Sequence, residues 1–369
     1  MTRVFTSWEK KRLLVGRLKR FTRWGYWPAS VVYFPIVVFN CFYLAIKYRG
    51  LMVFTAANPA IEDGGVINES KKDILKHLAL SGDEAIPNFL ELLFEESLEV
   101  RKVKVEKALS EGYINFPCVF KPNAGQRGTG VVVVHDQDEL DFHLESMKED
   151  HLLQAFCHGR EVSVFYYRYP TEKTGRVFSV TLKQLPEVIG DGQSTLLELI
   201  LKHDKHVCMA QYLVSILKDR LDEVPKNKEV VILNEIGAHC KGTIFSDGQA
   251  HITTDLVTKI NSIMCRDQGL CFGRFDIMVP DLESLEKGVN LKIIELNGVT
   301  SESTNIYDEK FSIFGAWKVL LKQWSIAYRI GHEQRALGNK PSSLIKIIQQ
   351  ILTYRKKVIT YSGVGESQA

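Results

Sequence analysis

The sequence predicts an α+β protein, in which short strands and helices follow one another along most of the chain. From residue 116 onward, short runs rich in β-branched and aromatic residues alternate with amphipathic runs of helical period. Turns such as Asp191-Gly192 and Asp247-Gly248 separate these runs. The composition, with 45% apolar and 25% charged residues, is that of a globular protein. It excludes disordered, collagen-like and polytopic membrane proteins.

The chain of 369 residues is long enough for two or three structural units with a sizeable core. Lys and Arg total 47 and Asp and Glu total 44, so the net charge is +3 and implies no attraction to nucleic acid. The seven cysteines are odd in number, and none forms a C-x-x-C pair. We therefore expect a reducing compartment and no structural zinc site.

The first fifty residues differ from the rest in charge. Residues 1–23 hold eight basic residues and one acid, a net charge of +7. Residues 24–46 carry no charge and are numerous enough to cross a bilayer. Aromatic residues at the start of this run and basic residues at both ends favour a re-entrant or interfacial segment. We expect residues 1–50 to bind an anionic membrane surface at its cytoplasmic, inner face. The alternative is a buried core helix.

Turn-forming and helix-capping residues indicate where helices and strands are expected to begin and end. Before residue 116 we expect a strand at 51–54, a helix at 70–80 capped by Ser70, and a charged helix at 97–112. Strands are expected at 117–122, 131–136, 151–156, 161–167, 176–185, 271–281 and 290–297. Helices are expected at 138–150, 195–200 and 209–224, with a hairpin at 243–253. The period of the apolar residues predicts a further amphipathic helix after residue 333. We expect it to pack on the protein, and the alternative is that it lies on the membrane.

A strand followed at once by a glycine-rich loop is the first candidate for chemistry. The strand delivers Lys121, and the loop that follows contains Gly125, Gly128 and Gly130. Glycines allow the backbone to approach a polyphosphate and to aim N–H groups at it, and Lys121 and Arg127 add positive charge. The loop lacks the order of a P-loop, and a plain hairpin is the alternative.

Two strands that carry acidic residues among apolar neighbours are the second candidate. Asp276 lies in the sequence Phe-Asp-Ile-Met, and Glu295 lies in Ile-Ile-Glu-Leu-Asn. With Asn297 they form an all-oxygen set that suits Mg²⁺. Arg274, two residues before Asp276 and so on the same face, could neutralise charge on a transferred phosphoryl group. The alternative is a buried ion pair of Arg274 with Asp276 or Glu295.

The order of these motifs resembles the ATP-grasp superfamily. The resemblance is carried by Lys121 with its loop, by Gly-Arg-Glu-Val-Ser-Val at 159–164, and by Arg-Phe-Asp-Ile-Met and Ile-Ile-Glu-Leu-Asn-Gly. It spans roughly residues 116–310 and is similar to D-alanine–D-alanine ligase and the carboxylate–amine ligases generally. Residues 188–195 also resemble a segment of cyanophycin synthetase.

The resemblance implies a fold and a division of the chain. Two α+β subdomains would clamp ATP within residues 116–332, after a shortened N-terminal region. Residues 1–50 would be the basic arm and membrane-associated segment, 51–115 a short substrate or linker region, and 333–369 a C-terminal helix and tail. The implied activity is a ligase that uses ATP and Mg²⁺, or Mn²⁺, to join a small-molecule carboxylate to an amine or thiol through an acyl phosphate. The rivals are a small-molecule kinase of the same superfamily and a non-catalytic membrane-bound ATP-binding scaffold.

The resemblance also implies roles for single residues. Lys121 would contact the ATP phosphates, Arg274 would stabilise the acyl phosphate, and Lys241 would make a further phosphate or substrate contact. Gly64-Gly65 with Glu69 resembles the substrate-binding turn of D-alanine–D-alanine ligase, and the loop 298–305 would face the acyl acceptor. The family's earlier ATP-binding lysine has no clear position, with Lys102 and Lys104 as guesses. The remaining implied ligands are the nucleotide-binding Gly125, Gln126, Arg127, Gly128, Gly130, Gln154, Phe156, Cys157 and Glu161, and the metal-binding Asp276, Glu295 and Asn297.

Overall fold

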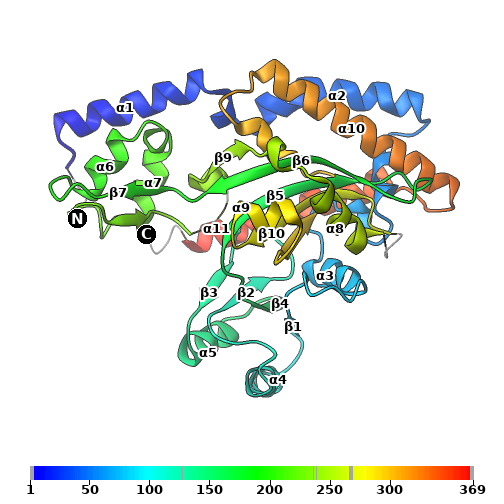
Figure 1. The fold of residues 1–369 in the computed structure, drawn as a ribbon, viewed down its shortest axis with the longest axis horizontal. Coiled ribbons are helices and arrows are strands. Elements are labelled where there is room, and N and C mark those ends of the chain that lie inside the picture. The colour runs from blue at the N-terminus through cyan, green and yellow to red at the C-terminus, as the bar shows by residue number, and fades with distance from the viewer. Residues whose placement is uncertain (1–3, 126–127, 236, 238, 266–268, 366–369) are drawn as a thin grey trace. The chain divides into compact units, whose positions relative to one another are not determined.

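The computed structural model describes residues 4–125, 128–235, 237, 239–265 and 269–365. Helices and antiparallel strand pairs are mixed along the chain, which confirms the α+β class (Figure 1). Contacts divide the chain into two compact units. We call Met1–Val38, Thr181–Asp247 and Thr304–Val319 the arm unit, and Phe39–Val180, Gly248–Ser303 and Leu320–Ala369 the body unit. The four-part division expected from the sequence stays a prediction.

The body unit contains a four-stranded antiparallel sheet with two helices. Its strand order is β1 (Phe89–Leu92), β4 (His151–Ala155), β2 (Cys118–Pro122) and β3 (Val132–Val134). Helices α4 (Leu98–Ser110) and α5 (Gln137–Glu145) lie beside it, and the side chains of Ser97 and Asp136 cap their N-termini (Figure 1). A core that includes Val105, Phe120 and Leu140 joins the helices to the sheet. The sheet therefore holds β2, the strand of Lys121, from both sides.

The body unit's second sheet carries the acidic motifs. Strand β10 (Phe272–Val279) lies between β11 (Lys292–Asn297) and β5 (Arg160–Tyr167), antiparallel to both. Strand β6 (Arg176–Gln184) follows β5 in the order. Phe165 and Phe272 pack in one core with Tyr328, which belongs to the body part of α10 (Ile313–Ala336). In the chain, helix α8 (Thr254–Met264) precedes β10, and helix α9 (Leu282–Lys287) follows it. A buried, aromatic-rich core thus holds β10 rigidly in the middle of the sheet.

The arm unit is built around a separate core of aliphatic side chains. Helix α6 (Leu196–Lys202), the 3-10 turn His206–Met209, α7 (Ala210–Ile216) and the pair β7 (Glu187–Ile189) and β8 (Val230–Ile232) supply that core. Thr195 and Glu198 form the predicted capping box of α6. Helix α1 (Ser7–Thr22) packs Leu13 against this core. The last residues of β6, Thr181–Gln184, pair with β9 (Ile244–Asp247) in the same unit.

The uncharged run expected to associate with a membrane forms helix α2 (Ala29–Lys47). Val32, Val37 and Leu44 of this helix are buried, and the Trp317 indole donates to the Val32 carbonyl oxygen at 2.7 Å. These contacts agree with the packing alternative for one side of the run. Among the residues that the structure describes, no helix is both long and apolar enough to cross a membrane.

Several local predictions are confirmed and others are wrong. Helices α3 (Lys71–Ala79), α4 and α11 (Leu344–Gly365) match expectation, and Ser70 caps α3. The strand expected at 51–54 is wrong, because Val53 and Phe54 enter the core from a 3-10 turn, Val53–Ala57. A short apolar run cannot distinguish these two conformations.

The hairpin expected at 243–253 is also wrong. Strand β9 ends at Asp247, and a 3-10 turn, Gln249–His251, takes the place of a returning strand. The backbone N–H of Asp247 donates to the Asp308 carboxylate at 2.8 Å, and its own carboxylate accepts from the Asn305 side chain at 2.6 Å. Contacts with residues about sixty positions along the chain therefore hold Asp247 at the end of β9.

Candidate functional site

Strands β10 and β11 present four polar side chains on one face of the second sheet. In their register Asp276 lies opposite Glu295, and Arg274 lies opposite Asn297. Directly opposed residues of an antiparallel pair point to the same side, and so do residues two apart on one strand. Arg274, Asp276, Glu295 and Asn297 therefore share a face, as the spacing within each strand predicted. We call them the strand cluster.

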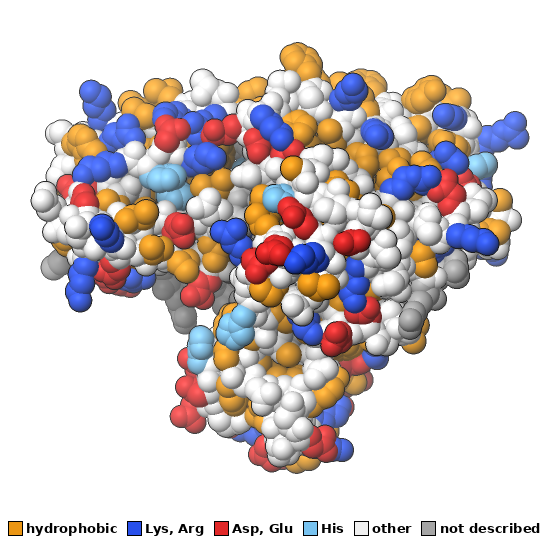
Figure 2. Space-filling model, in the orientation of Figure 1, with side chains coloured by type: hydrophobic (Ala, Val, Ile, Leu, Met, Phe, Trp, Pro, Cys, Tyr) orange, Lys and Arg blue, Asp and Glu red, His pale blue; other side chains and the backbone are white. Residues whose placement is uncertain are grey.

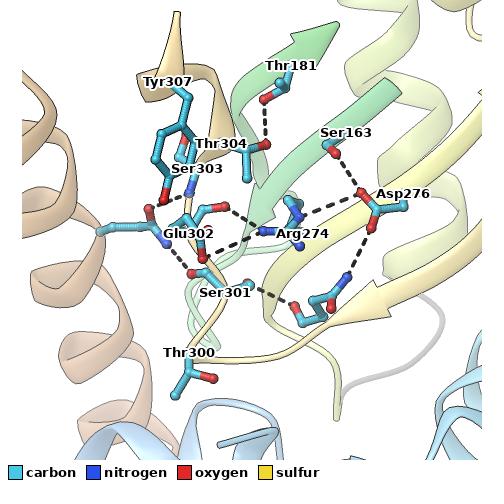
Figure 3. Close-up of polar contacts among 12 residues, drawn as sticks. Ser163, Thr181, Arg274, Asp276, Thr300, Ser301, Glu302, Ser303, Thr304 and Tyr307 are labelled. Atoms are coloured by element: carbon cyan, nitrogen blue, oxygen red, sulfur yellow. Dashed lines mark hydrogen bonds and ion pairs between the residues drawn. The ribbon is translucent and has the colours of Figure 1, made fainter. Parts of the chain in front are cut away.

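The carboxylate of Asp276 is the most enclosed member of the strand cluster, with 6% of its surface exposed. The Ser163 hydroxyl of β5 donates to its Oδ1 at 2.5 Å (Figure 3). The Asn297 amide donates to its Oδ2 at 3.2 Å. Arg274 Nε lies 3.6 Å from Oδ1, so the ion-pair alternative is present alongside the oxygen set. Neighbours on both flanking strands thus hold this carboxylate in one position.

Arg274 also fixes the loop that follows β11. Its Nη1 donates to the Glu302 carbonyl oxygen at 3.0 Å (Figure 3). Ser301 donates to the carbonyl oxygens of Asn297, at 3.0 Å, and Gly298, while the Ser303 N–H donates to Gln323 of α10. The loop is therefore tied at its start, middle and end. Its proposed contact with an acyl acceptor stays a prediction.

Lys121 connects the two sheets of the body unit. Its ammonium donates to Gln154 Oε1 of β4 at 2.6 Å and to the Ile294 carbonyl oxygen of β11 at 3.1 Å. Only 5% of its surface is exposed. Burial lowers the pKa of Lys121 to about 8, although the charge of Glu295 acts in the opposite direction. Lys121 therefore lies beside β11, the strand that carries Glu295 of the strand cluster.

A second lysine, which sequence reasoning missed, reaches the same place. Lys71, the first residue of α3, donates to the Gly125 carbonyl oxygen at 2.9 Å and lies 3.5 Å from Glu295 Oε1. The two positions suggested from the sequence for the family's earlier ATP-binding lysine make other contacts. Lys102 pairs with Asp141 at 3.1 Å, and Lys104 pairs with Glu96. Two adjacent lysines at a helix start carry no chemical signature, so only the tertiary structure could identify Lys71.

The glycine-rich loop adopts conformations that favour glycine. Gly125, Gly128 and Gly130 all have positive φ, and a Cβ at Gly130 would lie 2.8 Å from the Pro122 ring. Larger residues would be strained at these positions. Gln126 and Arg127 lie outside the described residues, so their predicted roles stay predictions.

Of the residues expected at the adenine and ribose, Gln154 contacts Lys121 directly. Gln154 is buried, and its Nε2 has no hydrogen-bond partner among the described residues. Phe156 packs edge-on against His158, and burial raises the pKa of the Cys157 thiol. Glu161 lies two residues before Ser163 on β5 and therefore on the face of the strand cluster.

Glu69 lies beside the start of the loop that follows β11. Its Oε2 accepts the Gly298 N–H at 3.1 Å, and a Cβ at Gly65 would lie 2.2 Å from that oxygen. Burial raises the pKa of Glu69 to about 7, and the Glu295 charge adds to the rise. Gly65 and Glu69 therefore lie together, and their role in binding a substrate stays a prediction.

Lys241 belongs to the arm unit, whereas the strand cluster, Lys121 and the other described nucleotide-binding candidates belong to the body unit. Its carbonyl oxygen accepts from the Asn234 side chain at 3.1 Å. The neighbouring His239 stacks on Tyr307 at 4.7 Å, and burial lowers its pKa to about 4. That histidine is a neutral packing residue, and the role of Lys241 stays a prediction.

The strand cluster fits a divalent cation only if a ligand adds oxygens. No group of three or more His, Cys, Asp or Glu side chains could hold a metal within the described ranges. Two opposed carboxylates with one amide are, however, the partial set with which proteins bind Mg²⁺ together with phosphate. The donor chemistry therefore fits a cation that arrives with a nucleotide.

Comparison with known proteins gives no family assignment. No family model matches the chain, and no curated protein matches it significantly. Matching solved structures include a bifunctional glutathione synthetase from Pasteurella multocida, with 16% identity over 68% of this chain and a TM-score of 0.40. They also include the VanG D-Ala:D-Ser ligase from Enterococcus faecalis, with 15% identity over 69% of this chain and a TM-score of 0.39. A third is the D-alanine–D-alanine ligase from Bacillus anthracis complexed with ATP, with 18% identity over 70% and a TM-score of 0.40.

These matches are partial. The chain spans 35% of the glutathione synthetase, 61% of VanG and 67% of the Bacillus anthracis ligase. The neighbours are ATP-grasp enzymes, the superfamily that the motifs resemble.

Proposed function

We propose that this chain is an ATP-dependent ligase that joins a small-molecule carboxylate to an amine through an acyl phosphate. One observation carries the proposal. Two lysines from separate elements converge on β11 next to the strand cluster: Lys71 lies 3.5 Å from Glu295 Oε1, and Lys121 donates to the carbonyl oxygen of Ile294 at 3.1 Å. Cations beside a paired set of carboxylates are what the binding of a polyphosphate with its metal ion requires.

The nucleotide would lie between the two sheets of the body unit. Lys121 and Lys71 would donate to phosphate oxygens, and the backbone of the loop from Gly125 to Gly130 would cover them. The unpartnered Nε2 of the buried Gln154 supports a ligand here, because a buried donor without an acceptor is costly. A ring nitrogen of the base would provide that acceptor, and Glu161 would bind ribose hydroxyls.

Asp276, Glu295 and Asn297 would hold Mg²⁺ together with phosphate oxygens. When bound, the cation neutralises charge on the terminal phosphates. Ser163 supports this role because it orients the Asp276 carboxylate by a hydrogen bond of 2.5 Å. The Asn297 amide, which donates to Asp276 in this structure, would rotate so that its carbonyl oxygen becomes a ligand.

The reaction would proceed in two displacements. In the first, the substrate carboxylate attacks the γ-phosphorus, the bond to the leaving oxygen breaks, and ADP departs. In the second, the amine attacks the acyl carbon, loses a proton, and displaces inorganic phosphate. Arg274 lies two residues from Asp276 and would stabilise charge on the transferred group. The chain's contribution is positioning and electrostatic stabilisation.

The test is a product-resolved assay with purified full-length protein, MgATP and pools of amino acids and other carboxylates. ADP and phosphate are measured separately, and hydroxylamine is added to trap an acyl phosphate. We expect phosphate release that depends on both a carboxylate and an amine. ADP formation with a stable phosphorylated product would instead establish a kinase. Tight ATP binding without turnover in any pool would establish a binding scaffold.

A matched pair of variants locates the activity. Asp276→Asn removes one charge from the strand cluster, whereas Asp138→Asn removes one from the exposed side of α5. Only the first should abolish turnover. Equal activity in the two variants would refute the site assignment.

A further inference from the structure

Helix α1 presents apolar side chains to solvent along one side. Trp8, Leu14, Leu18 and Phe21 are 41%, 55%, 57% and 75% exposed. Their spacing places them on one half of the helix, which we call the outward face. In an ordinary surface helix such residues would point into the core. The outward face therefore has no partner within the described part of the chain.

The packing of the opposite face prevents α1 from turning these residues inward. A Cβ at Gly16 would lie 2.1 Å from the Val207 carbonyl oxygen, so the helix lies directly on the arm unit at this point. Arg12 Nε donates to the Leu201 carbonyl oxygen at 2.9 Å, and Lys19 pairs with Asp204. These three contacts fix the rotation of the helix about its axis. The exposure of the outward face is thus a property of the folded arm unit.

Basic side chains border the outward face. Lys10, Lys11, Arg17 and Arg20 are exposed and form no ion pair within the described ranges. Figure 2 shows basic side chains gathered over α1 at the upper left. The only acid of α1, Glu9, is 6% exposed and accepts the Thr6 N–H in the capping box. Exposed apolar residues, including Trp8, between unpaired cations match the chemistry of an anionic lipid surface. On such a surface, apolar side chains enter the boundary between headgroups and acyl chains, while the basic side chains contact the anionic headgroups.

We infer that the outward face of α1 docks the protein on an anionic lipid bilayer, with the helix lying in the plane of the interface. This binding is peripheral and is independent of the proposed ligase activity. It places the lipid contact on α1, within the residues 1–50 for which the sequence had predicted membrane binding.

Vesicle flotation with the full-length protein tests the inference. Vesicles of phosphatidylcholine are compared with vesicles that also contain phosphatidylglycerol, at low and at higher salt. We expect flotation with the anionic vesicles only, and weaker flotation as salt rises. Equal flotation with both compositions, or none with the anionic vesicles at low salt, would overturn the inference.

Substitutions of apolar residues distinguish specific binding by the outward face from nonspecific hydrophobic adsorption to vesicles. Leu18→Ser with Phe21→Ser should reduce partitioning at least about tenfold, because two apolar contacts with the acyl boundary are lost. The control is Val103→Ser with Phe142→Ser, which changes residues that are 62% and 68% exposed on α4 and α5. The control pair should float like the parent protein. Equal losses in the two pairs would contradict a specific face.

Charge variants test the electrostatic part. Lys10→Glu with Lys11→Glu should reduce partitioning by about tenfold or more. Lys148→Glu with Lys173→Glu, exposed elsewhere, alters the net charge equally and should have little effect. Circular dichroism and the melting temperature check that each variant folds. If size-exclusion chromatography shows instead that Leu18→Ser with Phe21→Ser dissociates a dimer while vesicle binding persists, the face binds a second copy and the inference fails.

Discussion

The replacement Lys71→Met gives the sharpest test of the candidate site, because Lys72 provides a matched control. The two residues are adjacent in the first turn of α3, but their side chains have different surroundings. Lys71 reaches Gly125 and Glu295, whereas Lys72 Nζ lies 3.7 Å from Asp150. Methionine keeps the length of the stem and the helix propensity while it removes the ammonium group.

The structure sets the size of the expected effect on stability. The Lys71 side chain is 10% exposed, and a hydrogen bond from a charged donor contributes about 1.5–3 kcal/mol. Its ion pair adds little, because Glu295 is 34% exposed and partly screened by solvent. We expect Lys71→Met to lower the free energy of unfolding by about 2 kcal/mol. Lys72→Met breaks only a surface pair, worth about 0–1 kcal/mol.

The effect on nucleotide binding is the decisive measurement. If Lys71 donates to a phosphate oxygen, Lys71→Met should weaken MgATP binding by about 10- to 100-fold, which corresponds to about 1.4–2.8 kcal/mol. Lys72→Met should change binding less than about fivefold. Isothermal titration calorimetry with MgATP and thermal unfolding of both variants provide the data. Similar binding constants for the two variants would refute the role of Lys71, and a stability loss without a binding loss would make it purely structural.

Three further predictions concern other parts of the chain. Asp276→Asn should lower metal-dependent turnover by at least about a hundredfold in a steady-state assay, and a smaller loss would argue against metal binding there. The raised pKa of Glu69 means that the folded state holds a proton that the unfolded chain releases, so stability should fall as pH rises from about 4.5 to about 7. Glu69→Gln should reduce the change in the free energy of unfolding over this pH range by up to about 3 kcal/mol. Urea unfolding at several pH values measures it, and an unchanged pH profile would exclude Glu69 as its source. Gly16→Ala should destabilise the protein by about 2 kcal/mol in thermal unfolding, because its Cβ would meet the Val207 carbonyl oxygen. Gly315→Ala, whose Cβ makes an ordinary 3.6 Å contact, should be neutral or stabilising, and equal effects would contradict the packing of α1.

Local periodicity explains which parts of the site could be predicted. Arg274 and Asp276 are two residues apart on one strand, as are Glu295 and Asn297 on the next, and strand geometry alone places each pair on one face. Helices α3 and α6 were likewise predictable, because Ser70 and Thr195 cap them through contacts three residues along the chain. The failures at 51–54 and 243–253 occurred where distant partners decided the local conformation.

The sequence by itself determined the α+β class, the same-face spacing within β10 and within β11, and the positively charged, partly apolar character of the first fifty residues. Each depends on neighbours within a few positions. Only the tertiary structure decided that Asp276 lies opposite Glu295, that Lys121 reaches the carbonyl of Ile294, and that Lys71 reaches Gly125. It also decided that α1 turns its apolar residues outward. These contacts join residues far apart in the chain, and their geometry follows from strand register and core packing, which no local pattern encodes.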